Sequence, residues 1–324
     1  MSRTGSFIQS SVSYIIYLQF VSFVEPVQKD YFCAMKMSGF TIIKNAVLND
    51  YPVVEAIRSV LPVVDEMIVS IGDGEDETEA LIRSIGDPKI KIIHSVWDPE
   101  LKKGGKVLAV ETDKSKAACS PDADWLFYIQ ADEVIPEQYH APIRDAALMY
   151  KDNKKVEGLL FNYLHFYGTY EYVGDSRKWY NKEIRIIRND PGITAFRDAQ
   201  GFRKGNTRLN VKQIPAWVYH YGWVKSPELM KRKLKNTGVF WHGDEAGFQE
   251  FLKTEDYFDY NDFDSLKKFL GKHPEVMKER VSKGNPAVQL DITRKKFSLK
   301  KRFLYWFEKK TGIRPFSFRN YRII

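Results

Sequence analysis

The stretch Trp125-Leu126-Phe127-Tyr128-Ile129-Gln130-Ala131-Asp132-Glu133 decides the fold of this chain. Its first five residues are apolar and rich in aromatic rings, which is typical of a buried strand. The run ends at two adjacent carboxylates, Asp132 and Glu133. Acidic residues that follow a strand lie where open α/β sheets bind ligands, and their oxygens suit a hard divalent cation. The simpler interpretation of Asp132 and Glu133 is a solvated acidic turn. The surrounding sequence must therefore distinguish a ligand site from such a turn.

Strand and helix signals alternate around this stretch. Strands are predicted at 40–43, 67–70 and 89–94, and helices at 52–60, 77–85 and 107–119. Repeated βα units of this length predict an α/β fold with a mostly parallel central sheet and helices on both faces.

After Ala141 the alternation weakens. Further strands are predicted at 159–166, 183–188, 209–214 and 216–220, with one helix from the N-cap Ser226 to about Asn236 and another over 266–281, interrupted near Pro274. We therefore expect three parts: an atypical extension over 1–36, a sheet domain over 37–236, and a helical, basic region over 237–324.

The predicted extension contains an apolar run over 14–24 that is too short to span a bilayer. It lacks the basic flank and the small-residue cleavage site of a signal peptide. Met35 and Met37 stand just before the first convincing strand. We therefore expect that the gene start is assigned too far upstream.

Composition narrows the classes of function. The chain has 324 residues, 44% of them hydrophobic, which is enough for one large domain with an appendage. The net charge of +8 fits an anionic partner such as a nucleotide or a membrane surface. No nucleic-acid partner is expected, because the basic residues cluster in 294–322 rather than across a recognition motif. Two cysteines exclude a disulfide framework and a zinc cluster, and favour a cytoplasmic location.

Polar motifs follow the first, second and fourth predicted strands. They are Lys44-Asn45, the acidic loop 73–78, and the run 130–133. In a parallel sheet these strand ends lie at one edge, so the motifs should converge. His220 follows a later short strand, and the topology predicts that it shares one cation with Asp132.

This order of motifs resembles the family 2 inverting glycosyltransferases, in the branch that modifies bacterial surface polysaccharides and lipopolysaccharide. The resemblance covers 38–235 and includes the His-containing segment 218–224. It implies a GT-A fold, a Rossmann-like domain that binds a nucleotide-sugar donor with a divalent cation, Mn²⁺ or Mg²⁺. It also implies a glycan or lipid-linked glycan acceptor and an inverting single displacement.

The resemblance assigns site residues to three roles. The metal ligands are Asp132 and His220, with Glu133 second. The nucleotide-sugar-binding residues are Lys44, Asn45, Asp73, Asp76, Lys106, Gln130, Arg185 and Arg188. Asp198 is the best match for the catalytic base, with Asp175 and Glu183 as competitors.

Gln130 departs from the family, which has an aspartate there. A neutral amide cannot replace the charge of a carboxylate. A catalytically weak or inactive nucleotide- or glycan-binding relative therefore stays open as an alternative. A nucleotidyltransferase is a second one, although 44–48 lacks the glycines expected after the first strand of such enzymes.

The basic tail over 294–324 also contains Phe297, Phe303, Trp306 and other apolar residues. This composition is typical of an interfacial amphipathic helix, which predicts a peripheral contact with the inner face of the plasma membrane. A helix packed on the catalytic domain with a solvated basic face fits the sequence equally well.

Overall fold

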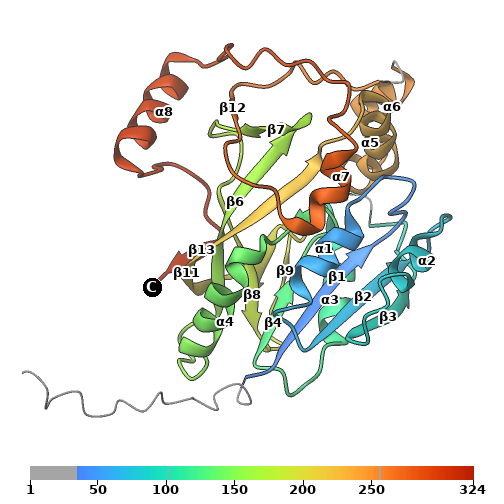
Figure 1. Ribbon diagram of the computed structural model, residues 1–324, viewed down its shortest axis with the longest axis vertical. Helices are drawn as coiled ribbons and strands as arrows, with labels where there is room; N and C mark the ends of the chain where they lie inside the picture. The colour runs from blue at the N-terminus through green and yellow to red at the C-terminus, as the bar shows by residue number, and fades with distance from the viewer. Residues whose placement is uncertain (1–34, 102, 255–256) are drawn as a thin grey trace, which may run out of the picture. The chain divides into compact units, whose positions relative to one another are not determined.

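Four parallel strands open the sheet of this computed structural model, which describes residues 35–101, 103–254 and 257–324 (Figure 1). They are β1 (Met37–Ile43), β2 (Glu66–Gly72), β3 (Ile90–Ser95) and β4 (Trp125–Tyr128), in the spatial order β3-β2-β1-β4. The connecting helices are α1 (Val53–Val60), α2 (Thr78–Arg83) and α3 (Lys106–Ala117).

The strand β4 is covered on both faces. Trp125 and Phe127 belong to one core cluster, to which α1 contributes, whereas Leu126 and Tyr128 belong to a second cluster, against which Leu108 of α3 packs. Successive side chains of a strand point to opposite faces, so this alternation requires a helix layer on each side. The predicted α/β architecture, with helices on both faces of the sheet, is confirmed.

The second half of the sheet is mixed. The strand β8 (Lys182–Arg188) runs antiparallel to β4, β6 (Gly158–Tyr167) runs antiparallel to β8, and β11 (Thr207–Trp223) runs parallel to β6. The two-residue strand β5 (Glu133–Val134) pairs with β11 and sets His220 opposite Glu133. This pairing brings the downstream histidine to the acidic end of β4.

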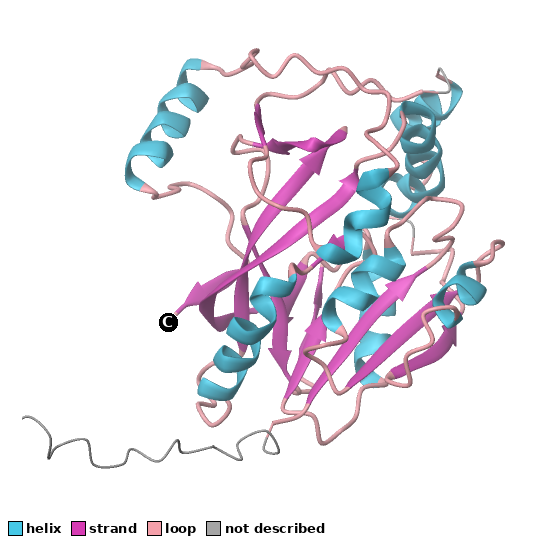
Figure 2. Ribbon diagram, in the orientation of Figure 1, coloured by secondary structure: helices cyan, strands magenta, loops and turns pink. Residues whose placement is uncertain are grey.

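The remaining strands extend this sheet (Figure 2). The strands are β7 (Thr169–Gly174), β9 (Ile193–Phe196), β10 (Gly201–Lys204), β12 (Leu266–Lys268) and β13 (Tyr321–Ile323). The helices are η2 (Glu137–Tyr139), α4 (His140–Met149), α5 (Pro227–His242), α6 (Ala246–Lys253), η3 (Glu275–Met277), α7 (Lys278–Ser282) and α8 (Leu299–Thr311). Within the described ranges, no helix combines the length and apolar character that crossing a bilayer needs.

Three local predictions need correction. The segment 266–281 is not one helix: β12 pairs antiparallel with β7, and Pro274 begins the short helices η3 and α7. The two strands expected at 209–214 and 216–220 form the single strand β11, whose register shifts around Pro215, a residue without an N–H. The helix that follows the confirmed N-cap Ser226 ends at His242 and so crosses the predicted boundary after residue 236.

The predicted extension over 1–36 lies outside the described residues, apart from its last two. Residues 35–324 form one compact unit. The division at residue 236 stays a prediction.

Candidate active site

Asp132 lies between β4 and β5, at the C-terminal edge of the parallel strands. Its Oδ2 is 3.5 Å from Nε2 of His220 on β11 and 3.2 Å from Nζ of Lys233 on α5. A Cβ at Gly222 would lie 2.4 Å from the same oxygen, so only glycine leaves room there. Burial alone would raise the pKa of Asp132, but His220 and Lys233 hold it below its ordinary value. The carboxylate is therefore ionised.

A second histidine orients His220. His165 on β6 places its Nδ1 3.3 Å from Nδ1 of His220 and its Nε2 3.0 Å from the carbonyl oxygen of Tyr180. A carbonyl only accepts, so the hydrogen-bond network assigns the proton of His165 to Nε2. Burial, followed by the charge of His220, lowers the pKa of His165 well below its ordinary value. His165 is thus neutral, and its Nδ1 accepts the proton of Nδ1 of His220.

This tautomer makes a partial cation site. With its Nδ1 proton donated to His165, His220 directs Nε2 at the Asp132 carboxylate, where Nε2 can share a proton with Asp132 or bind a cation held between the two. Among the described residues, no three His, Cys, Asp or Glu side chains gather around a common point. The residues fit a divalent ion with two protein ligands, whose other positions are left for ligand oxygens and water. A metal ion can bind only if the Lys233 ammonium moves away from Asp132. Otherwise Lys233 supplies the positive charge at this position in place of a metal ion.

Two lysines meet beside Asp132. The Nζ atoms of Lys225 and Lys233 lie 5.5 and 4.8 Å from the ring centroid of Tyr51. Burial, with repulsion from Lys233, lowers the pKa of Lys225 to about 7. An anion such as a phosphate group beside Nζ would favour the charged form of Lys225, which already donates to the Asp50 carbonyl and lies 3.8 Å from Asp50 Oδ2.

Glu133 is not a metal ligand, contrary to prediction. Its carboxylate accepts from Nε and Nη2 of Arg185 at 2.7 and 2.5 Å, from the Tyr163 hydroxyl, and from the Gln130 N–H at 3.1 Å. Both partners of the ion pair are fully buried. Arg185 is consequently committed to Glu133, and its predicted phosphate contact is also corrected.

Arg188 lies at the wrong end of the sheet for a phosphate ligand. It pairs with Trp125, the first residue of β4, and its guanidinium lies 3.8 Å from the centroid of that ring. Its N–H groups donate to the backbone carbonyls of Tyr150, Lys151, Asn153 and Val156. Arg188 holds the C-terminal end of β8 against the loop after α4.

The loops after β1 and β2 interlock at the edge of the sheet. Lys44 Nζ donates to Asp73 Oδ1 at 3.0 Å, and Glu75 N–H donates to Oδ1 of Asn45, a left-handed residue with φ of 54°. Burial would raise the pKa of Asp73, but the Trp97 N–H and Lys44 lower it. The predicted convergence of Lys44, Asn45 and Asp73 is therefore present.

Asp76 braces these loops. Its Oδ2 accepts from the Leu48 N–H at 2.7 Å, and its Oδ1 accepts from the N–H and hydroxyl of Thr78. Asp76 thus supports the loop, and a contact of its carboxylate with the nucleotide remains a prediction.

Lys106 is exposed in the first turn of α3. The two glycines before it do not form a free phosphate loop, because the N–H groups of Gly104 and Gly105 donate to the carbonyls of Trp241 and Phe240 at 3.1 and 2.8 Å. A contact with the donor through the Lys106 side chain remains a prediction.

Asp198 lies in a constrained turn between β9 and β10. Arg197 and Ala199 on either side both have φ of 58°, a conformation that L residues keep only where the surrounding structure holds them. Trp241 Nε1 donates to Asp198 at 3.2 Å, and Gly105 packs so closely that a Cβ there would lie 2.3 Å from Asp198 Cβ. Such a fixed carboxylate suits a base, and this role remains a prediction.

Gln130 and Glu183 lie near the same turn. Gln130 Nε2 is 3.5 Å from the carbonyl of Ala199, and Gln200 Nε2 donates to Glu183 at 3.1 Å. Burial raises the pKa of Glu183 to about 8, and the charge of Asp198 contributes. Glu183 is thus protonated at neutral pH, which disfavours it as the base.

Asp175 is removed from the base candidates. It accepts from the Tyr305 hydroxyl at 2.5 Å and from Lys309 Nζ at 2.6 Å, and Lys295 lies 3.5 Å away. All three partners belong to the C-terminal tail. Asp175 therefore anchors α8.

His165, Lys233 and Gly222 were missed by the sequence analysis. The approach of His165 to His220 comes from the parallel register of β6 and β11, which leaves no trace in either segment. Lys233 was detectable in principle, since it lies two turns into the helix that begins at Ser226, directly after the His220 strand.

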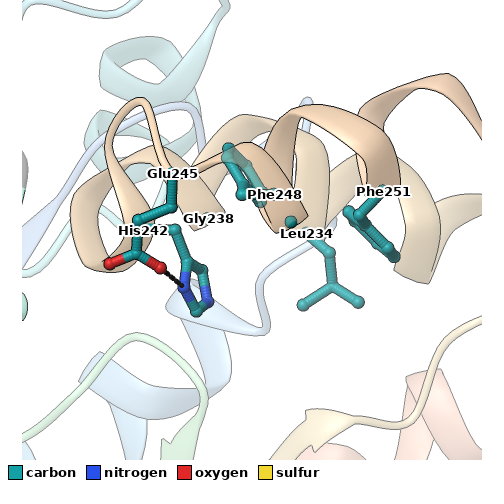
Figure 3. A pocket seen from close by; sticks show the side chains of 7 residues that line it. Leu234, Gly238, His242, Glu245, Phe248 and Phe251 are labelled. Atoms are coloured by element: carbon teal, nitrogen blue, oxygen red, sulfur yellow. Dashed lines mark hydrogen bonds and ion pairs between the residues drawn. The ribbon is translucent and has the colours of Figure 1, made fainter.

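A pocket of about 460 Å³ lies between α5 and α6 (Figure 3). Figure 3 shows Leu234, Phe248 and Phe251 along it, with His242 and Glu245 at one end. Asp132 and His220 are not among its lining residues, so it is separate from the candidate site.

Comparisons with protein-family models and with curated proteins each give no match. Solved structures with a similar fold include glucosyl-3-phosphoglycerate synthase from Mycobacterium tuberculosis in complex with Mn²⁺, UDP and phosphoglyceric acid, at 20% identity over 41% of this chain and 44% of that chain, with a TM-score of 0.29. S. aureus TarS 1-349 is 16% identical over 67% of this chain and 69% of its own, with a TM-score of 0.35.

The 4-diphosphocytidyl-2C-methyl-D-erythritolsynthase from Anaerococcus prevotii is 14% identical over 48% of this chain and 70% of its own, with a TM-score of 0.31. This chain thus spans less than half of the length of the Mycobacterium synthase.

Proposed function

We propose that this chain is a glycosyltransferase that moves a sugar from a nucleotide-sugar donor to a glycan or lipid-linked glycan acceptor. One observation carries the proposal: Asp132 faces His220 and Lys233 at the strand edge where the loops of Lys44 and Asp73 also lie. Open α/β sheets bind ligands at this edge.

Each part has a chemical role in the proposal. A divalent cation held by Asp132 and His220 would stabilise the charge that develops on the leaving nucleoside diphosphate. Lys233 and Lys225 bind the phosphates, and the loops that carry Asn45 and Asp73 hold the nucleoside. Asp198 takes the proton of the acceptor hydroxyl as general base. Inverting transfer and a polysaccharide acceptor are proposed from the family resemblance.

Thermal unfolding against a panel of nucleotide sugars, with and without Mn²⁺ or Mg²⁺, tests the proposal. A donor at a hundred times its Kd stabilises the fold by about 2.7 kcal/mol. We expect a metal-dependent shift with one donor that disappears in Asp132→Ala and persists in the exposed control Glu250→Ala. If no donor in the panel shifts the wild type, and none is turned over, the proposal is wrong.

A nucleotide- or glycan-binding relative without transfer activity is the second candidate. It is favoured by Lys233, which lies on the oxygen that a metal would need, and by the neutral Gln130. This function predicts a donor shift that is the same with and without metal, and no release of nucleoside diphosphate from any donor.

A further inference from the structure

The helix α8 presents apolar side chains to the solvent. Leu299, Phe303 and Trp306 follow one another at spacings of four and three, so they share one face of the helix. Their exposed fractions are 87, 60 and 54%. A helix packed on a core would bury such a face.

The opposite face of α8 is the one that holds it to the protein. Tyr305 and Lys309 bind Asp175, and Arg177 Nη1 donates to Glu308 at 2.8 Å. These polar contacts fix the orientation of the helix. Because the opposite face is held against the protein, Leu299, Phe303 and Trp306 are directed to the solvent.

Basic residues surround the exposed face. The sequence of α8 contains five lysines and arginines and a single acidic residue, Glu308, which is paired with Arg177. The exposed basic residues of the helix are Lys300, Lys301, Arg302, Lys309 and Lys310. An apolar stripe bordered by positive charge is complementary to a lipid surface with anionic head groups, and a neutral protein partner would not use the charge.

We propose that α8 docks flat on an anionic lipid surface. Leu299, Phe303 and Trp306 enter the boundary between head groups and acyl chains, and Arg302 and Lys310, which lie three or four residues from them on the helix, contact the head groups. This docking is independent of the proposed sugar transfer.

Co-sedimentation of the full chain with vesicles tests the docking. One vesicle is phosphatidylcholine alone, and the other contains equal parts of phosphatidylcholine and phosphatidylglycerol. We expect binding to the anionic vesicle only, weakened by salt, with a blue shift of Trp306 fluorescence. The variant Phe303→Ser/Trp306→Ser should lose about tenfold or more of its partitioning, as should Arg302→Glu/Lys310→Glu.

A matched pair of variants controls for general stickiness. Leu270 is 89% exposed in the loop after β12, so Leu270→Ser should leave binding unchanged while Leu299→Ser weakens it. Equal binding to both vesicles, or full binding by Phe303→Ser/Trp306→Ser, would overturn the proposal. A concentration-dependent dimer that Phe303→Ser/Trp306→Ser dissociates would also overturn it, because a second copy of the chain would then cover the apolar face of α8. No nucleotide enters the assay, so its failure is separate from failure of the proposed transferase.

Discussion

The hydrogen bond at Nδ1 of His220 orients its ring toward Asp132. His165 accepts the proton of Nδ1, and Nε2 of His220 is thereby placed 3.5 Å from the Asp132 carboxylate, where it can bind a cation. Replacing the residue that orients a metal ligand costs about 10- to 100-fold in metal affinity. We predict a loss of this size in Mn²⁺ affinity for His165→Phe, measured by electron paramagnetic resonance in the presence of the best nucleoside diphosphate.

The variant His165→Asn provides the matched control, because its Oδ1 can accept in place of Nδ1. Affinity should largely return in this variant. An equal loss in both variants would mean that His165 acts only through packing, since its ring also contacts Tyr163, Tyr180 and Trp179.

Glu183 gives the protein a pH-dependent stability. Its pKa is about 8 in the folded state, because of burial, against an ordinary 4.5. The folded state therefore holds an extra proton between these values, and stability falls as pH rises from about 4.5 to 8. Between about pH 5 and pH 8 the wild type should lose about 3 to 4 kcal/mol in free energy of unfolding through this group, and Glu183→Gln should not show this loss, as measured by urea denaturation.

The exposed Glu279 serves as the reference for this experiment. Glu279→Gln should keep the wild-type profile. If Glu183→Gln also keeps it, the Glu183 carboxyl is ionised in the folded protein, and it returns as a competitor of Asp198 for the role of base.

At the scale of elements, Asp175 determines whether α8 stays attached. Burial would raise the pKa of Asp175, but Lys309 and Tyr305 lower it, so the carboxylate is charged at neutral pH. Asp175→Asn should remove the ion pairs and increase hydrogen exchange of the amides in α8, at a cost in global stability of about 1 to 2 kcal/mol. Exchange in β4 should remain slow. Unchanged exchange in α8 would mean that Arg177 and Glu308 hold the helix alone.

Elements were predictable where both faces of a strand are buried. The apolar runs of β1, β2 and β4 are short, continuous and followed by polar motifs, so their positions could be read from the sequence. The strand β12 could not, because Leu266-Lys267-Lys268 has no strand pattern and pairs with β7 only through tertiary contacts. At the edges of a sheet, tertiary pairing can make a strand of residues whose own strand propensity is low.

At the scale of the whole molecule, the edge that carries the site was predictable, but the partners of each side chain were not. Parallel strand ends place Lys44, Asp73 and Asp132 together by topology alone. Arg185 and Arg188 lie on a strand antiparallel to β4, so one meets Glu133 inside the core and the other reaches the opposite end of the sheet. Which end each arginine reaches depends on a strand direction that one sequence does not reveal.

The C-terminal residues close the molecule by joining the sheet. The strand β13 pairs in parallel with β11, setting Leu209 opposite Tyr321, and Arg203 Nε donates to the buried Asn320 at 2.6 Å. Ending the chain at residue 318 would leave the backbone of β11 without this partner and release the far end of the segment that carries α8. We predict a loss of about 2 to 3 kcal/mol in the free energy of unfolding, measured by urea denaturation. Phe316→Ser, at an exposed position of the same segment, should change it by less than about 0.5 kcal/mol, and an equal effect of both changes would contradict a role for β13.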